Sequence, residues 1–436
     1  MPTSIARNAL RLMPLLLCLA SLVFCPGSTA TAQESTAAAS KLDDAPKWFK
    51  GNLHTHSLWS DGDQFPEMIA LWYKQRGYNF LALTDHNVLS EGQRWMKEKD
   101  IVARSDKGVV DRYRNQFGEN WVQTRTSGDP KLTEVRLKPL NEFRALLEQA
   151  GQFIMIQAEE ISDRAAGKPV HINATNIAEV IQPAGGSTVR EAMQNNLRMI
   201  LQHEKEHGRE VLPHINHPNF GSAISAEDLA AVLSERFFEV YNGHPGVKHL
   251  GDDKLPSMEQ LWDQVNAIRC GTAGAPPIMG IATDDSHEYH GKPGSRPGRG
   301  WVMVRSRFLS PEHLIQAMKR GDFYASSGVT LSDVQFNEET RSLQVAIEPE
   351  PDTKYQIDFI ATLKHHAEGK TDEHDHVGVT VKSVTGTQAT YQMRGDELYV
   401  RAQITSSQAH TDPSFKNQKE QAWTQPVGWS AAPAGQ

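Results

Sequence analysis

The run FLALTDH at residues 80–86 decides the fold class, because a short apolar strand ends there in an acidic residue and an imidazole. The same order recurs along the chain in GNLHTH at residues 51–56, FIMIQAEE at residues 153–160 and IMGIATDD at residues 278–285. Continuous apolar runs of this length are typical of strands that are buried on both faces. Each predicted strand therefore delivers polar side chains at its end.

Helical patterns separate these strands, at residues 66–77, 188–207, 226–234, 258–268 and 311–320. Alternation of strand and helix predicts a parallel sheet in an α/β protein. About eight strands over roughly 270 residues suit a closed or nearly closed barrel, whose C-terminal strand ends carry the chemistry. An open, doubly wound sheet is the alternative.

Two segments depart from this alternation. Residues 97–139 are charged and lack a clear period, so we interpret them as an insertion over one barrel face, either a lid or a plain surface excursion. After residue 328, alternation of apolar and polar residues begins, as in LSDVQF at residues 331–336. Such alternation is typical of β-sandwiches. We therefore predict a barrel at residues 48–328 and a smaller all-β, sandwich-like domain at residues 329–436.

The N-terminus has the pattern of a secretory signal. Arg7 and Arg11 precede an apolar stretch at residues 12–24, and small residues follow at 30–32. The stretch is too short for a comfortable transmembrane helix, although an uncleaved anchor is the alternative. We expect cleavage after Ala32, a flexible leader at residues 33–47, and an exported protein, periplasmic or secreted, with no transmembrane segment in the mature chain. Cleavage would leave Cys270 as the one cysteine, so no internal disulfide is expected.

The composition excludes some partners and indicates a site. The 436 residues include 45 Lys and Arg against 53 Asp and Glu, a formal net charge of -8. Duplex nucleic acid and anionic lipid require clustered cations, so neither is expected as a partner. The chain also contains 18 histidines. Because histidine is the commonest metal ligand, this number favours a metal site over packing.

Histidines and carboxylates at the strand ends form a candidate metal site. In HTH at residues 54–56 both imidazoles lie on one face of a strand, because strand side chains repeat every two residues. An H-x-H motif is common by chance, but polar residues at successive strand ends are not. Mixed nitrogen and oxygen ligands suit zinc, manganese or iron. The candidate residues at these strand ends are His54, His56, Asp61, Asp85, His86, Glu159, Glu160, His171, His214, His217, Asp284, Asp285 and His287.

With these motifs the chain resembles the polymerase and histidinol phosphatase (PHP) family. The matching segments are HTHS at 54–57, LTDH at 83–86, AEEI at 158–161, HP at 217–218 and DSH at 285–287. The resemblance implies a distorted (β/α)7 barrel of the TIM-like kind. It also implies two or three divalent metal ions and hydrolysis of a phosphate ester by water activated at the metal centre.

The resemblance further implies how the ligands divide among the ions. Glu160 is preferred to Glu159 because the family pattern places Ile-Ser after the acidic residue. Asp285 is preferred to Asp284 because it has the D-x-H spacing. The implied sets are His54, His56, Glu160 and Asp285 for the first metal, Glu160, His171 and His217 for the second, and Asp61, His86 and His287 for the third.

The resemblance names a reaction type but not a substrate. We expect a small phosphorylated substrate, with Lys168, near His171 in sequence, as a candidate contact. His214 is a candidate for catalysis or substrate binding, and a packing role is its alternative. His203 and His207 are expected on a solvated helix face. The C-terminal domain is a candidate for binding carbohydrate or an envelope component. Hydrolysis of a non-phosphate ester or amide, or a non-catalytic exported binding module, are the alternative functions.

Overall fold

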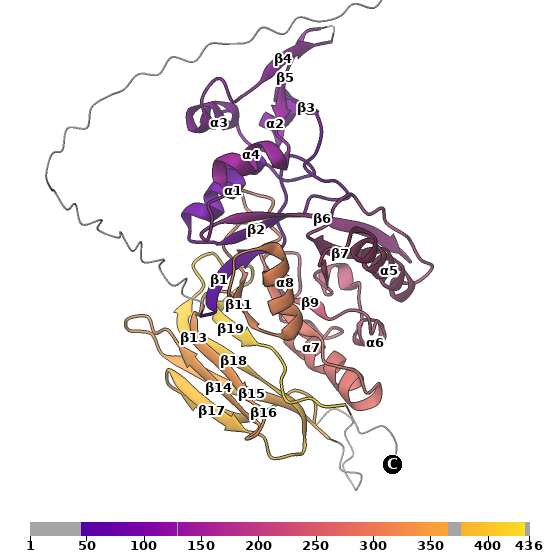
Figure 1. The fold of residues 1–436 in the computed structure, drawn as a ribbon, viewed down its shortest axis with the longest axis vertical. Helices are drawn as coiled ribbons and strands as arrows, with labels where there is room; N and C mark the ends of the chain where they lie inside the picture. The colour runs from indigo at the N-terminus through magenta and orange to yellow at the C-terminus, as the bar shows by residue number, and fades with distance from the viewer. Residues whose placement is uncertain (1–44, 129, 365–375, 432–436) are drawn as a thin grey trace, which may run out of the picture. The chain divides into compact units, whose positions relative to one another are not determined.

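The chain is a mixed α/β protein with a large central sheet, seen in a computed structural model that describes residues 45–128, 130–364 and 376–431 (Figure 1). The expected signal at residues 1–32 and nearly all of the leader lie outside the described residues. The sheet has the order β10-β9-β8-β7-β6-β2-β1-β11-β12-β19-β18-β15-β16. Its first part comprises β1 (Lys47–Asn52), β2 (Phe80–Leu83), β6 (Ile154–Ala165), β7 (Lys168–Thr175), β8 (Leu212–Ile215), β9 (Phe237–Asn242), β10 (Met279–Thr283), β11 (Trp301–Ser306) and β12 (Phe323–Ser326).

The helices between these strands begin and end at residues suited to those positions. Thr188 caps the first turn of the long helix α5 by accepting from the Glu191 N–H, and Gly208 ends it in the left-handed conformation. Ser257 and Gln260 form a reciprocal capping box on α7. The helices are α1 (Pro66–Gln75), α5 (Val189–His207), α6 (Ala226–Ala230), α7 (Met258–Asn266) and α8 (Pro311–Arg320), with a 3₁₀ turn η1 (Phe220–Ser222) and a π-helix η2 (Ala267–Thr272).

Only part of the sheet is parallel, which corrects the expectation of a uniformly parallel sheet. The pairs β1–β2, β2–β6, β8–β9 and β9–β10 are parallel, whereas β6–β7, β7–β8 and β1–β11 are antiparallel. The cause lies in the two residues that join β6 to β7. Ala166 (φ 48°) and Gly167 (φ 77°) both have positive φ and make a tight hairpin turn, which leaves no room for a crossover helix.

The strands from β10 to β12 form a curled sheet. This curvature is evident because strands from both ends of that series contribute side chains to one buried cluster. Phe49 of β1, Ile281 of β10 and Val304 of β11 belong to this cluster, together with residues of α8. The Gln425 side chain donates to and accepts from the backbone of Gly280, each bond 2.9 Å long. Among the described residues, no ladder joins β10 to β11, but a parallel bridge between Thr55 and Ser286 joins the chain just after β1 to the chain just after β10. In this bridge the Asp285 N–H donates to the His54 carbonyl at 3.0 Å, and the His56 N–H donates to the Ser286 carbonyl at 2.9 Å.

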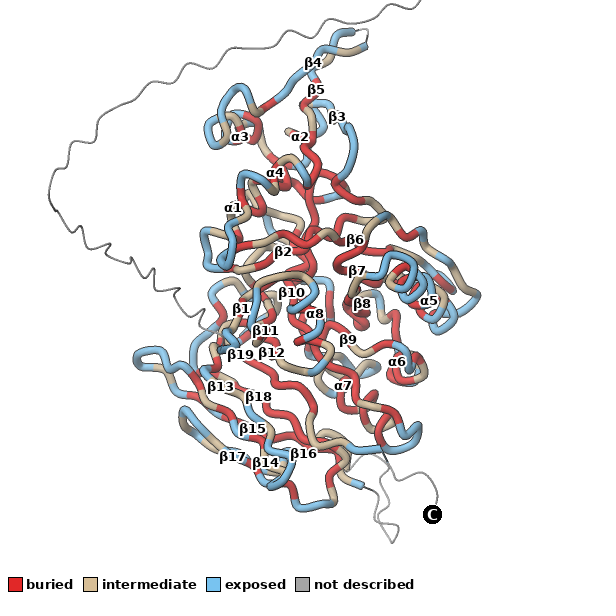
Figure 2. Tube along the Cα trace, viewed as in Figure 1, coloured by how far each residue is buried: buried red, intermediate tan, exposed pale blue. Residues whose placement is uncertain are grey.

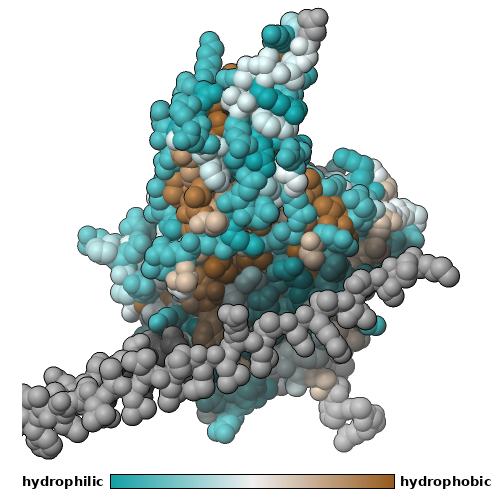
Figure 3. Space-filling model, turned by 45° about the horizontal axis from the view of Figure 1, so that its top comes forward, coloured by the Kyte–Doolittle hydropathy of each residue, from teal (hydrophilic) through white to brown (hydrophobic). Residues whose placement is uncertain are grey.

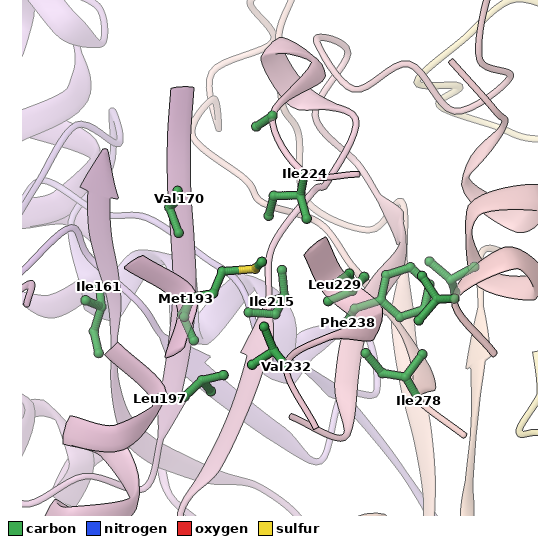
Figure 4. Close-up of a cluster of buried hydrophobic side chains, with 14 of the residues drawn as sticks. Ile161, Val170, Met193, Leu197, Ile215, Ile224, Leu229, Val232, Phe238 and Ile278 are labelled. Carbon is green, nitrogen blue, oxygen red and sulfur yellow. The ribbon is translucent and has the colours of Figure 1, made fainter. Parts of the chain in front are cut away.

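Helices cover the other face of these strands. A second buried cluster packs Ile161, Ile215 and Phe238 of the sheet against Met193 and Leu197 of α5 (Figure 4). Strands such as β2 and β9 are consequently buried along their whole length (Figure 2). This two-sided burial is the reason that β2 is continuously apolar and that the polar residues of β9 are limited to Glu239 and Asn242.

The segment predicted as an insertion has secondary structure of its own. It comprises β3 (Arg94–Lys97), α2 (Glu98–Arg104), α3 (Val109–Phe117), β4 (Thr124–Ser127) and β5 (Leu132–Leu137), and α4 (Leu140–Leu147) follows it. The strands form a separate sheet in the order β3-β5-β4. A buried cluster packs this segment against Leu58, Trp59 and Phe65, in the connection between β1 and α1.

The C-terminal strands lie in two sheets that share a buried apolar cluster. Strands β13 (Leu331–Asn337), β14 (Ser342–Ile347) and β17 (Gln388–Gln392) form the smaller sheet. Strands β15 (Tyr355–Leu363), β16 (Val379–Thr385), β18 (Glu397–Ala409) and β19 (Lys419–Thr424) extend the central sheet, because β19 pairs with β12. The domain boundary near residue 328 therefore falls within a continuous sheet and stays a prediction.

The face of the molecule turned forward in Figure 3 is largely hydrophilic, with hydrophobic side chains in separate patches. Among the described residues, no helix combines the length and apolar character needed to cross a membrane.

Candidate metal centre

The nine predicted ligands lie together at one end of the curled sheet. Because parallel strands present their carboxyl ends at the same edge, residues that follow β1, β2, β8 and β10 converge there. The hairpin of β6 and β7 reaches the same place, since Glu160 and His171 contact each other across it. The residues after strand ends are His54, His56, Asp61, His86, His217, Asp285 and His287, and those within the hairpin are Glu160 and His171.

Four buried side chains form the innermost group. The Nε2 atoms of His54 and His56 are 3.1 Å apart, and Asp285 Oδ1 is 3.2 Å from each. The two oxygens of Glu160 are each 3.5 Å from one of these imidazole nitrogens. The left-handed conformation of Asp285, with φ 48°, turns its carboxylate toward the histidines after β10.

Asp61 organises a second, more exposed group. Its carboxylate lies 3.4 Å from His86 Nε2, 3.5 Å from His287 Nε2 and 3.6 Å from His56 Nδ1. Asp61 is 54% exposed, while His56 is fully buried. This group is therefore the part of the cluster that a molecule from solvent meets first.

Glu160 links the groups to the hairpin and to β8. Its oxygens lie 2.7 Å from His86 Nδ1, 2.9 Å from His171 Nδ1 and 3.6 Å from His217 Nε2. Three overlapping sets of candidate ligands result: His56, Asp61, His86 and His287; His54, His56 and Glu160; and His86, Glu160 and His171.

These residues fit divalent metal ions. Asp285 Oδ1 and both Glu160 oxygens converge on the Nε2 atoms of His54 and His56, and each of these nitrogens can bring at most one proton, so the group holds more acceptors than donors. His56 Nδ1 is buried and has no hydrogen-bond partner among the described residues. Buried polar atoms are normally paired, and cations would satisfy these acceptors. Imidazole and carboxylate ligands are those of zinc, manganese and iron sites.

The electrostatics of the metal-free cluster keep its carboxylates ionised. Burial would raise the pKa of Asp61, but hydrogen bonds from His287 and His86 hold that pKa far below its ordinary value. Burial lowers the pKa of His56 to about 3, and the neighbouring His287 acts in the same direction. Burial would also lower the pKa of His86, but Glu160 and Asp61 raise it to about 11. Protons on imidazoles such as His86 therefore occupy positions that metal ions would take.

A buried carboxylate behind the cluster, Glu239, escaped the sequence analysis. His54 Nδ1 and Thr283 Oγ1 lie 2.7 Å from Glu239 Oε1, while the His217 N–H and Asn242 Nδ2 donate to Glu239 Oε2 at 2.8 Å. A carboxylate that binds the outer nitrogen of a ligating histidine fixes the tautomer of that histidine. The available signal was a lone glutamate in FFEVYN, an otherwise apolar strand.

The structure separates the members of the two ambiguous acidic pairs. Glu159 points away from the cluster, and its Oε1 accepts the Ile181 N–H at 2.6 Å. Asp284 accepts from the Tyr73 hydroxyl at 2.6 Å and from three backbone N–H groups at residues 298–300. Their neighbours Glu160 and Asp285 lie in the cluster, as the family resemblance implied.

The two candidate substrate contacts lie apart from the exposed side of the cluster. His214 is fully buried, and its Nε2 lies 3.5 Å from Glu239. Lys168 is exposed at the tip of the β6–β7 hairpin, opposite Ala165. Among the described residues, no hydrogen bond or ion pair joins Lys168 to any of the nine predicted ligands.

The expectation of a solvated helix face is wrong for His203. This residue is buried, and its Nε2 accepts the Ala178 N–H at 2.9 Å. His207 is exposed and lies 3.5 Å from Glu179. The three side chains are close enough to form a candidate ligand group, but the backbone bond already engages a nitrogen of His203.

Comparison with known proteins adds two solved structures. No family model and no curated protein match the chain. A two-domain protein from Bacteroides vulgatus ATCC 8482, containing a predicted PHP-like metal-dependent phosphoesterase, matches at 17% identity and a TM-score of 0.38, covering 88% of this chain and 96% of that chain. A candidate metal-dependent phosphoesterase from Bifidobacterium adolescentis ATCC 15703 matches at 12% identity and a TM-score of 0.30, covering 58% and 92%. The chain itself carries the histidine and carboxylate groups of a candidate metal centre.

Proposed function

We propose that the chain is a metal-dependent hydrolase that cleaves phosphate esters at a centre of two or three divalent ions. The observation that carries this proposal is the convergence of nine imidazole and carboxylate side chains, several of them buried, in overlapping groups of candidate ligands. We take the curled sheet as the distorted (β/α)7 barrel implied by the sequence motifs. Zinc, manganese and iron are the ions that suit these ligands.

The geometry supports a division of labour among the ligands. His54, His56, Glu160 and Asp285 would hold the inner ion, since their atoms lie 3.1 to 3.5 Å apart. Asp61, His86 and His287 would hold an ion at the exposed side, and Glu160 with His171 and His217 a third. Bound divalent ions lower the pKa of water and stabilise the charge that develops on phosphoryl oxygens.

The chain itself orients and shields this centre. Glu239 holds His54 in one tautomer and fixes the backbone at His217, so both residues are positioned before any ion arrives. Burial of His54, His56 and Glu160 excludes bulk water from the inner side. A substrate therefore approaches from the side of Asp61, the exposed member of the set.

The segments outside the site complete the proposal. We propose that residues 1–32 direct export to the periplasm or the exterior and that residues 329–436 fold as a separate β domain. The signal-like pattern and the change to alternating residues support these two statements. N-terminal sequencing of the mature protein should give Gln33 as the first residue, and a start before residue 25 would refute cleavage after Ala32.

Metal removal tests the function directly. Phosphate release from a generic phosphoester should stop after chelation and return after addition of zinc, manganese or iron. The rate should fall from pH 8 toward pH 5, because an imidazole must be neutral to bind metal and ordinarily titrates near ~6.5. The double variant His54→Ala/His56→Ala should lose at least about 100-fold in turnover, whereas His207→Ala, at an exposed position far along α5, should not.

The outcomes discriminate among the functions. Full turnover by the chelated protein or by the double variant would refute a metal hydrolase. Turnover of a carboxylic ester or amide without phosphoester turnover would favour the alternative hydrolase. Bound metal without turnover of any of these substrates would favour a binding module.

A further inference from the structure

Three exposed cations line the entrance of the metal centre without carboxylate partners. Arg94 donates to the carbonyl of Trp59, Arg104 donates to the carbonyl of Ser60, and Lys292 donates to the carbonyl of Arg104. Among the described residues, none of the three forms an ion pair. We name Arg94, Arg104 and Lys292 the cationic rim. Longer-range attraction joins Arg94 to Asp85 and Lys292 to Asp63, while Arg104 has no such interaction among the described residues.

The cationic rim adjoins the exposed side of the cluster. Ser60, whose carbonyl accepts from Arg104, immediately precedes Asp61, and its hydroxyl lies 2.6 Å from Asp85 Oδ1 and 3.2 Å from Asp61 Oδ1. Asp61 in turn contacts three imidazoles, so it is not free to neutralise the rim. Two guanidinium groups therefore border the same opening through which a substrate would reach the ions.

The elements that carry Arg94 and Arg104 are packed against the connection between β1 and α1. Arg94 and Arg104 belong to β3 and α2 of the insertion, which a buried cluster anchors to the 57–67 segment. Tyr113 stacks on Phe65 with ring centroids 3.9 Å apart, and Trp59 Nε1 donates to the Lys138 carbonyl. This packing makes the insertion a static side of the entrance, with no need for a lid movement to place the two arginines.

Each rim cation keeps donors for a ligand. A guanidinium has five N–H donors, and the carbonyl bonds of Arg94 and Arg104 use one each. The ions in the centre would already neutralise the scissile phosphate. The rim, on the outer side of Asp61, is suited to a second negative group farther along the substrate, because charge-assisted hydrogen bonds to oxyanions are the strongest that arginine makes.

We propose that the cationic rim selects phosphate esters whose leaving group carries an oxyanion of its own, either a carboxylate or a second phosphate. This inference rests on the proposed phosphoesterase function. Arg94 and Arg104 hold the second oxyanion, and Lys292 adds positive charge at the same edge. A substrate with an uncharged leaving group reaches the ions without these contacts and binds more weakly.

The test compares three substrates of matched length: propyl phosphate, 3-carboxypropyl phosphate and propane-1,3-diol bisphosphate. At low salt, the metal-loaded protein should show kcat/KM at least ~10-fold higher, per scissile group, for a charged tail than for propyl phosphate. The two charged tails identify which oxyanion is preferred. Arg104→Gln and Arg94→Gln should each lower this selectivity ratio at least ~5-fold, mainly through KM. The control variant Arg198→Gln changes an exposed residue of α5 and should leave the selectivity ratio and the rates unchanged.

A binding measurement distinguishes failure of the cationic rim from failure of the proposed phosphoesterase function. If the metal-loaded wild type hydrolyses none of the three compounds, the proposed function fails, and calorimetric titration of the same compounds still tests the rim. Tighter binding of the charged tails, lost in Arg104→Gln, would support the rim. Equal binding or turnover of all three compounds, or an equal loss of selectivity in Arg198→Gln, would overturn it. Thermal unfolding of each variant confirms that it is folded.

Discussion

At the scale of single residues, adjacent glutamates of β6 differ because strand side chains alternate between faces. Glu160 faces the histidine cluster, and Glu159 faces the Ile181 N–H behind the sheet. Glu160→Gln should therefore reduce bound metal and lower turnover by roughly 100-fold or more, since an amide does not neutralise cations. Glu159→Gln should keep wild-type metal content. Elemental analysis and phosphate release measure both variants, and equal losses would show that Glu160 is not a ligand.

Glu159 also makes stability depend on pH. Burial raises the pKa of this carboxyl to about 7, although the Ile181 N–H opposes the shift. A carboxyl whose folded pKa exceeds its unfolded value favours the folded state at low pH, and this contribution disappears as pH rises toward 7. Glu159→Gln should therefore stabilise the fold at pH 8, on the order of 1–3 kcal/mol, and have less effect at pH 5. Denaturant unfolding at the two pH values measures this difference, and a larger gain at pH 5 would contradict it.

Short sequence motifs predicted the residues of the innermost group, but they did not identify Glu239, which positions His54. Motifs such as HTH and DSH carry enough spacing information to place His54, His56 and Asp285 together. Glu239 has no motif around it, and it comes beside His54 because β9 pairs with β10 and the chain after β10 bridges to Thr55. Lys168 lies at the tip of the β6–β7 hairpin, although it is close to His171 in sequence, and its contact with substrate stays a prediction.

At the scale of elements, the apolar runs predicted strands correctly, but the direction of each strand was decided elsewhere. The β6–β7 hairpin depends on two residues with positive φ, and no apolar period reports that conformation. The insertion showed no clear period in the sequence, because its strands are short and one of them, β4, is mostly exposed. Long-range packing on Phe65 and Trp59, which a sequence window cannot include, gives the insertion its order.

The turn between β6 and β7 yields a prediction about backbone conformation. Ala166 occupies the left-handed region, which costs a residue with a Cβ about 1 kcal/mol, while Gly167 is unstrained there. Ala166→Asn should stabilise the protein by about 0.5–1 kcal/mol, because asparagine suits the first position of this turn. Gly167→Ala should destabilise it by about 1 kcal/mol. Denaturant unfolding measures both, and a stabilising Gly167→Ala would show that the turn differs from this geometry.

At the scale of the whole molecule, a buried ion pair connects the C-terminal strands to the helical layer. Arg401 of β18 donates to both oxygens of Asp263 on α7, at 2.7 and 3.0 Å, and the Tyr399 hydroxyl donates to the same carboxylate at 2.8 Å. The side chains are 1% and 6% exposed. Removing one partner of such a pair leaves a buried charge without compensation.

Asp263→Asn should consequently lower the free energy of unfolding by about 3 kcal/mol. It should leave the metal stoichiometry unchanged, because the candidate ligands precede residue 288 and none contacts this pair. The matched control is Asp111→Asn, which removes the exposed pair with Arg114 and should cost less than about 1 kcal/mol. Denaturant unfolding and elemental analysis of the two variants give both quantities. A loss of metal in folded Asp263→Asn would show that the C-terminal strands help to position the centre, and an effect no larger than that of the control would show that solvent reaches the pair.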